Sequence, residues 1–319
     1  MTTARSQLIC PDITPYYHCV SRCVRRSFLC GDDPLTGVSY SHRRDWVEQR
    51  LLDLASIYCI QICAYAVMSN HYHLVAFIDK QTALALSEQQ VIERWSRGHH
   101  IPALLQRFRN SQVTAQAEID ACHEMIEIWR ARLYSLSWFM RELNQHIATH
   151  ANREDNCTGR FWEGRFKSQA LLDEKALLAA MAYVDLNPLR ANIAATPEQS
   201  EYTSIKMRLE KLQHNQLSKP PLLDFIGYDN HDKTGIPFRL MDYLQLLDWL
   251  GRQVRAGKAG YIAPNTPQIL TRLSLPHKEC LTLCTALEMR SRLWIGTKEN
   301  LTIAKTRLNR QRMTAITIS

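Results

Sequence analysis

The sequence predicts an α+β fold in which an antiparallel sheet is flanked by helices. Two apolar, β-prone runs at 57–68 and 71–79 are joined by a two-residue turn, which is the pattern of a β-hairpin. Apolar residues recur at helical spacing over 42–55 and again over 173–187, which predicts amphipathic helices. Together these elements indicate a mixed core.

The remaining core elements follow in chain order. The β-prone segment PYYHCVSRC at 15–23 precedes the first helix and predicts a first strand, and FKSQALL at 166–172 predicts a last one. Asp173 is then a suitable N-cap for the helix that follows. Because proline disfavours the α region for the residue before it, we expect Pro188 to end that helix near Asn187.

The length of 319 residues exceeds the ~100–200 of one ordinary domain, so we expect a core with appendages. We assign a catalytic domain to 1–215, with a helical insertion at about 80–150 that lacks strand-like alternation. The Lys-Pro-Pro segment at 219–221 suggests a boundary. Beyond it, 220–319 is predicted to be a basic, mainly helical module whose anchor is the amphipathic segment 238–255.

Charge and composition narrow the class of protein. Lys and Arg outnumber Asp and Glu by 39 to 31, giving a net charge of +8 that suits a polyanionic partner. The start of the chain lacks the features of a signal peptide, and no run reaches the ~18–20 apolar residues of a membrane span. The ten cysteines show no C-x-x-C spacing, so we interpret them as small core residues. We therefore expect a cytoplasmic protein without a membrane partner.

His71 and His73 are two residues apart on the second strand of the predicted hairpin. Side chains at i and i+2 of a strand project to the same face, whereas Tyr72 projects to the other. This arrangement suits two imidazoles that share a metal ion. The alternative is a hairpin that carries two partly exposed histidines without a ligand.

A second pair of polar residues lies on the helix at 173–187. Tyr183 and Asn187 are four residues apart, so a continuous helix presents the phenol and the amide on one face. If that face packs on the hairpin, the amide could complete a metal site and the phenol could reach a phosphate held there. The alternative is a core tyrosine followed by an asparagine that ends the helix.

These segments resemble a known family. VMSNHYHLV at 67–75, GRFWEGRF at 159–166 and MAYVDLNPLRANI at 181–193 are similar to motifs of the REP-associated single-tyrosine HUH transposases. Members of that family share an H-hydrophobic-H strand and a downstream Y-x-x-x-N-P helix. The resemblance extends over roughly residues 15–205.

The resemblance implies a role for each matching residue. His71 and His73 would bind Mg²⁺ or Mn²⁺, Asn187 would be a further ligand, and Tyr183 would be the nucleophile. The fold implied is a ferredoxin-like HUH nuclease core, commonly in a homodimer, in a bacterial protein associated with the nucleoid. Two features depart from the family pattern: Tyr72 replaces an aliphatic residue, and the insertion and C-terminal module exceed those of compact members.

The resemblance also implies a reaction, which is cleavage and rejoining of single-stranded DNA that carries hairpins or repeats. Attack by tyrosine leaves a 5′-phosphotyrosine and a free 3′-hydroxyl, so the strand can be rejoined without ATP. Two other functions stay open: a non-catalytic DNA-binding protein domesticated from a transposase, and a metal phosphodiesterase or RNA-processing enzyme that uses water. A covalent protein–DNA adduct would distinguish them.

Cations alternate with aromatic residues over 160–167, a mixture typical of proteins that bind single strands. The alternative is that the aromatic residues belong to the core and the charges are merely solvated. Residues 290–319 carry seven Lys or Arg against one acidic residue and could add DNA affinity. The predicted DNA-contacting residues are Arg22, Arg25, Arg26, Arg160, Trp162, Arg165 and Lys167.

Overall fold

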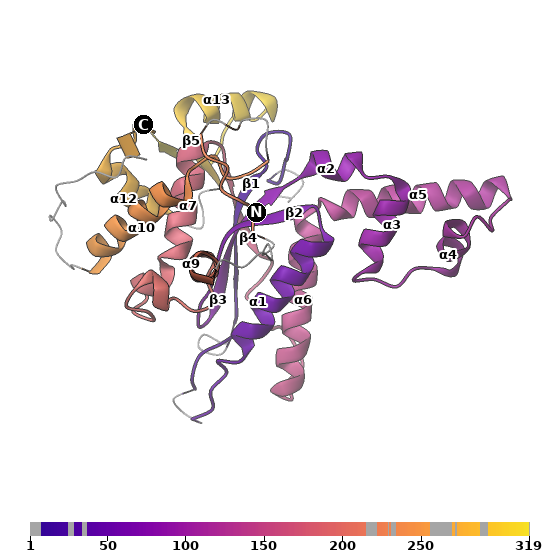
Figure 1. The fold of residues 1–319 in the computed structure, drawn as a ribbon, viewed down its shortest axis with the longest axis horizontal. Helices are drawn as coiled ribbons and strands as arrows, with labels where there is room; N and C mark the ends of the chain where they lie inside the picture. The colour runs from indigo at the N-terminus through magenta and orange to yellow at the C-terminus, as the bar shows by residue number, and fades with distance from the viewer. Residues whose placement is uncertain are drawn as a thin grey trace.

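The fold is mixed α+β, with a sheet flanked by helices on both faces (Figure 1). The computed structural model describes residues 8–24, 29–33, 37–214, 222–228, 230, 234–255, 270–271, 273–287 and 293–318. Within these residues the sheet has six strands in the order β2-β3-β1-β4-β5-β6.

The four strands β1 (Tyr16–Arg22), β2 (Ile60–Val67), β3 (His71–Ile78) and β4 (Lys167–Leu171) pair antiparallel. The predicted hairpin is confirmed, since β2 and β3 pair directly and Met68 N–H donates to the His71 carbonyl at 2.8 Å. The strand order β2-β3-β1-β4 is that of a ferredoxin-like sheet.

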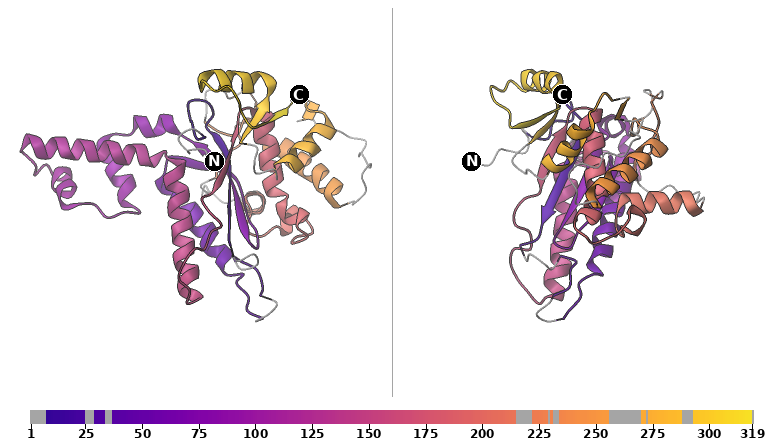
Figure 2. Two further views of the ribbon diagram at one scale, coloured as in Figure 1. Left: turned by 180° about the vertical axis from the view of Figure 1, so that it is seen from behind. Right: turned by 90° about the vertical axis from the view of Figure 1, so that its left-hand side faces the viewer.

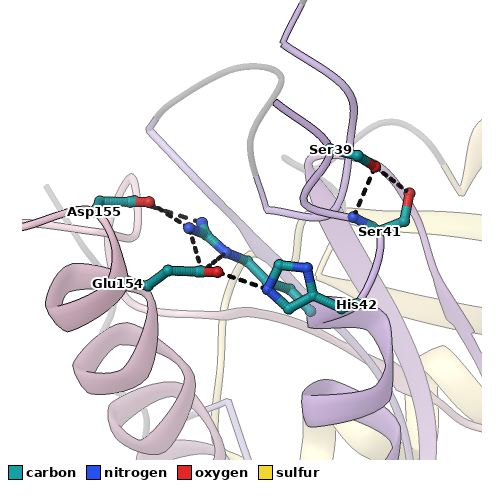
Figure 3. Close-up of polar contacts among 6 residues, drawn as sticks. Ser39, Ser41, His42, Glu154 and Asp155 are labelled. Carbon is teal, nitrogen blue, oxygen red and sulfur yellow. Dashed lines mark hydrogen bonds and ion pairs between the residues drawn. The ribbon is translucent and has the colours of Figure 1, made fainter. Parts of the chain in front are cut away.

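Two helices pack together on one face of this sheet (Figure 1). They are α1 (Arg43–Ile57) and α6 (Leu136–Glu154). The fully buried Arg43 joins the start of α1 to the end of α6, because its guanidinium pairs with Glu154 and Asp155. Figure 3 shows Glu154 beside His42, to which it is hydrogen-bonded, and Asp155 farther from that ring.

The expected insertion is helical, and most of it projects away from the sheet as an arm (Figures 1 and 2). Its helices are α2 (Lys80–Ala85), α3 (Glu88–Ser96), α4 (Ala103–Arg109) and α5 (Gln116–Leu133). The sequence-based boundary at 150 includes α6, which instead belongs to the core layer.

Glu142 of α6 attaches the arm to the core. Its carboxylate accepts hydrogen bonds from Tyr58 Oη at 2.6 Å and from His99 Nε2 at 2.7 Å. Burial alone would raise the pKa of Glu142, but these bonds and the charges of His99 and Arg50 outweigh it and lower that pKa. Glu142 is thus ionised and holds residues from three segments.

The other face of the sheet is covered by α7 (Glu174–Asp185), the short α8 (Asn187–Arg190), α9 (Ser204–His214), α10 (Leu240–Arg255) and α12 (His277–Ala286). A 3-10 turn, η2 (Pro197–Gln199), precedes α9. Two of these helices were predicted closely, α10 as 238–255 and α7 as 173–187. The 219–221 boundary lies outside the described residues.

The ends of α7 differ in how well the sequence predicts them. Asp173 is its N-cap, as expected, and its carboxylate accepts from Ala176 N–H at 2.9 Å. The C-terminal end is earlier than predicted, because Leu186, with φ −92° and ψ 0°, separates α7 from α8. Pro188 is accommodated in the first turn of α8, where a missing N–H costs little.

The described C-terminal part is mainly helical, as predicted, but it also supplies two short strands that were not predicted. These are β5 (Trp294–Thr297) and β6 (Ala315–Ile318), linked by α13 (Lys298–Arg307). Both strands run parallel to β4 and extend the sheet, so the sheet is not wholly antiparallel. Across the described part of the chain, no helix is long and apolar enough to cross a membrane.

Candidate functional site

The strand β3 carries the two histidines that the sequence singles out. His71 and His73 alternate with Tyr72, whose hydroxyl donates to Asn144 Oδ1 of α6 at 2.7 Å. Tyr72 therefore lies on the face covered by α1 and α6. The two histidines project to the opposite face, which α7 covers.

A third histidine on this face comes from β1 and was not predicted. His18 is opposite Gln169 of β4 in the antiparallel register, and both side chains are buried. His18 Nδ1 is 2.7 Å from Gln169 Oε1, and its Nε2 is 2.9 Å from Nδ1 of His73. These contacts join three strands in one chain of hydrogen bonds.

With Gln169 Oε1 as the acceptor, this chain assigns the nitrogen of each ring that carries a proton. Burial lowers the pKa of His18 to about 4, although the bond from Gln169 opposes the shift, so the ring is neutral at pH 7. The amide oxygen of Gln169 can only accept, so His18 Nδ1 is protonated and its Nε2 accepts from Nδ1–H of His73. His73 therefore keeps its lone pair on Nε2.

The same reasoning applies to His71. Its Nδ1 is 2.6 Å from Oδ1 of Asn70, an acceptor, so Nδ1 is the protonated nitrogen and Nε2 keeps the lone pair of the neutral ring. The rings of His71 and His73 are close, with centroids 4.8 Å apart. A metal-binding histidine usually donates the N–H of its second ring nitrogen to an oxygen acceptor, as His71 does here.

Tyr183 of α7 packs directly on these histidines. Its ring centroid is 5.3 Å from that of His73 and 5.9 Å from that of His18, both in edge-to-face geometry. The guanidinium of Arg190 lies 5.4 Å from the centroid of the same ring. Tyr183 is 5% exposed, so most of its ring is enclosed by these neighbours.

Asn187 begins α8, one turn after Tyr183, and is 8% exposed. Its buried Nδ2 has no hydrogen-bond partner among the described residues. The amide nitrogen and oxygen exchange places on rotation, so an oxygen can occupy that position. Leaving a buried amide unpaired costs about 1–3 kcal/mol, which a bound ion or ligand would offset.

The residues present fit a divalent metal ion. Two neutral imidazoles and one amide oxygen are ligands that Mn²⁺ accepts, and Mg²⁺ accepts them when water completes its shell. No cluster of three His, Cys, Asp or Glu with metal-binding geometry is found in the part of the chain that the structure describes. The candidate set therefore depends on Asn187 as a third ligand.

Cations lie on the histidine face as well. In the strand pairing, Arg22 is opposite His71, and Val20 is opposite both His73 and Lys167. Directly opposite residues share a face, so Arg22 and Lys167 flank the histidines. Together with Arg165 they line a small polar cavity of about 140 Å³. The predicted contacts Arg25 and Arg26 lie outside the described residues.

The cations and aromatic residues that alternate over 160–167 differ in their exposure. Arg160, Arg165 and Lys167 are exposed, as a DNA-binding role requires. Trp162 is buried instead, with its ring against Tyr72 and its Nε1–H donating to the Asn144 carbonyl at 2.8 Å. Its indole thus packs behind β3, where it also lines a larger cavity.

The chain matches no protein-family model and no curated protein sequence. Among solved structures, it is similar to that of a REP-associated tyrosine transposase bound to a REP hairpin. The two are 11% identical, the match covers 66% of this chain and 87% of the other, and the TM-score is 0.37. The two chains are therefore only distantly alike.

Proposed function

We propose that this protein cleaves and rejoins single-stranded DNA, with Tyr183 as the nucleophile and a divalent metal ion bound by His71, His73 and Asn187. The observation that carries the proposal is the packing of the Tyr183 ring against His73, whose lone pair is fixed on Nε2. The proposed nucleophile thereby contacts one proposed metal ligand, and the ring of the other, His71, lies 4.8 Å from that of His73.

When bound, Mg²⁺ or Mn²⁺ would polarise the scissile phosphate and neutralise its developing charge. Tyr183 Oη forms a bond to phosphorus, and the bond to O3′ breaks with its electron pair, leaving a 3′-hydroxyl once protonated. The 5′-phosphate stays on the tyrosine. A phenol has a pKa near ~10, so it must lose its proton during attack, and the cation of Arg190 beside the ring stabilises the phenolate.

The basic residues of the same face would hold the substrate. Arg22 and Lys167 flank the histidines and can bind phosphates on either side of the reacting one. A single strand suits this place, because the cavity beside them is small and lies between the end of β1 and the start of β4.

One observation favours a second candidate. Tyr183 is 5% exposed, and a ring so enclosed also suits an enzyme in which water attacks and Tyr183 only packs against the histidines. That protein would be a metal phosphodiesterase. It would cut DNA or RNA without becoming linked to the product.

A covalent adduct tests the choice between the two. The protein is incubated with end-labelled single-stranded oligonucleotides and Mn²⁺ and separated on a denaturing gel, and trapped adducts are digested and mapped by mass spectrometry. We expect the nucleotide on the AYVDLNPLR peptide. Tyr183→Phe should eliminate the adduct and keep DNA affinity, because it removes a single hydroxyl.

The matched controls are other tyrosines. Tyr134→Phe changes a half-buried residue at the end of α5, and Tyr72→Phe changes the tyrosine on the opposite face of β3. Both should keep the adduct. Cleavage without any adduct, or an adduct on another tyrosine, would overturn the assignment of Tyr183.

A further inference from the structure

A second, larger cavity lies behind the histidine strand, between α6 and the 160–166 loop. Its volume is about 650 Å³, within the range of about 300–1,000 Å³ common for small-molecule sites. Its lining is largely apolar and aromatic, with arginines among it. The residues that matter for its chemistry are Trp138, Phe161, Phe166, Arg141, Arg160 and Arg165.

The walls of this cavity are held in place by hydrogen bonds. Trp162 donates to the carbonyl of Asn144, and the side chain of Asn144 donates to Ser21 Oγ at 3.0 Å and accepts from Tyr72. Each of these residues is attached to α6, β1 or β3. The cavity is therefore preformed, and a ligand that enters it does not have to order it first.

The charge of the lining defines the kind of ligand. Arg141, Arg160 and Arg165 are exposed, and none of the described residues that line the cavity is acidic. Arg141 is held at the rim by Trp138, with its guanidinium 4.7 Å from the indole centroid. An apolar, aromatic lining beneath a cationic rim suits a planar ring attached to phosphate.

The cavity adjoins the histidine face at two neighbouring residues. Gly164 and Arg165 line both this cavity and the small one that contains Arg22 and Lys167. The loop between them follows the end of β1, since Glu163 N–H donates to the Arg22 carbonyl at 2.9 Å. A strand bound at the histidines can therefore pass Arg165 and reach the cavity.

We propose that this cavity takes one unstacked nucleobase of single-stranded DNA, while the arginines of its rim bind the flanking phosphates. The proposal rests on the proposed function in taking DNA as the ligand. An unpaired base offers its ring face for stacking, whereas a base in a duplex must first be extruded at a cost. The cavity would thus select single strands over duplexes.

The test measures equilibrium binding in the presence of a chelator, so that no cleavage occurs. Short oligonucleotides carry 2-aminopurine at each position in turn, and fluorescence identifies the position that enters the cavity. An abasic residue at that position should weaken binding to the wild type by about tenfold, which lies within the range for one stacked base. Trp138→Ala should weaken binding of the intact oligonucleotide comparably.

The abasic change should then have little further effect on Trp138→Ala, because the stacking is already lost. Arg141→Ala provides a second, exposed variant, and it should reduce the salt dependence of binding by about one phosphate contact, a slope change of roughly 0.7. Phe108→Ala is the matched control, since this half-buried aromatic residue lies on α4 in the arm. It should bind like the wild type.

Additive losses from the abasic change and from Trp138→Ala would overturn the cavity proposal, as would binding with no responsive 2-aminopurine position. The adduct assay is independent of this result. Loss of the abasic effect in Trp138→Ala together with no adduct would support the cavity and refute nucleophilic attack by Tyr183. An adduct on Tyr183 together with additive losses would support nucleophilic attack by Tyr183 and refute the cavity proposal.

Discussion

The hydrogen-bond chain through His18 makes the sharpest prediction. His18→Phe keeps a ring of similar size but removes the acceptor for His73 Nδ1–H and the donor to Gln169 Oε1. Each hydrogen bond lost costs about 0.5–1.5 kcal/mol, so the free energy of unfolding should fall by about 1–3 kcal/mol. Adding Gln169→Leu removes the polar group that bonded to His18 and should recover part of this loss.

The functional effect is separate from the loss of stability. Without His18, the hydrogen bond that favours the proton of His73 on Nδ1 is lost, so its Nε2 is less firmly reserved as a ligand. Losing a residue that orients a metal ligand typically weakens metal binding by about 10–100-fold. His18 would be a positioning residue, because it acts through His73.

Two measurements on folded protein test this reasoning. Isothermal titration with Mn²⁺ gives the affinity, and ¹⁵N NMR of the imidazoles gives the tautomer of His73 without any metal. His146→Phe, on α6 at the other face of the sheet, is the control and should change neither. A folded His18→Phe protein with unchanged affinity and His73 still protonated on Nδ1 would refute the argument.

Further predictions concern the ligands, the arm and the C-terminal strands. His71→Ala and His73→Ala should abolish cleavage and leave DNA affinity nearly unchanged, since affinity depends on Lys and Arg; undiminished cleavage by the double variant in chelator would exclude the metal. Glu142→Gln should lower the free energy of unfolding by about 1.5–3 kcal/mol at pH 7. Because the pKa of Glu142 is lowered in the folded protein, the difference in stability between wild type and variant should disappear as the pH falls through that pKa. Denaturant titrations at pH 7 and pH 3 measure this difference, and its persistence at pH 3 would contradict the prediction. Deleting 294–318 should destabilise the fold itself, measured as a lower Tm, because Trp294 and Ile295 are buried; an unchanged Tm would show that these strands are dispensable.

Local patterns predicted the parts of the fold that depend on neighbours in sequence. The β2–β3 hairpin needs only alternation and a two-residue turn, and the start of α7 needs only Asp173 as a cap. β5 and β6 escaped prediction because each has four residues, too few for a period, and because their pairing depends on β4.

The site shows the same division. The shared face of His71 and His73 follows from the period of a strand, and the interest of Tyr183 follows from its helical spacing with Asn187 and from the family resemblance. His18 and Gln169 could not be found in this way, because their significance comes from the register of β1 with β4. The sequence offers one weak signal, a histidine within a β-prone run. The roles of these residues, and a homodimer, stay predictions.

Because Tyr72 lies between His71 and His73, the chemistry of the site depends on the register of β3. The imidazole rings that would hold a metal project from one face of β3. The next residue, Tyr72, projects from the other face, toward the wall of the larger cavity. β2 already carries an irregularity in its pairing with β3 between Ile62 and Ala64. If one residue were inserted into or deleted from the Ser69-Asn70 turn, and β3 shifted its register by one residue, every side chain of β3 would move to the opposite face. Such a protein could keep its composition, its charge and its hairpin, and yet present a tyrosine where both imidazoles should be.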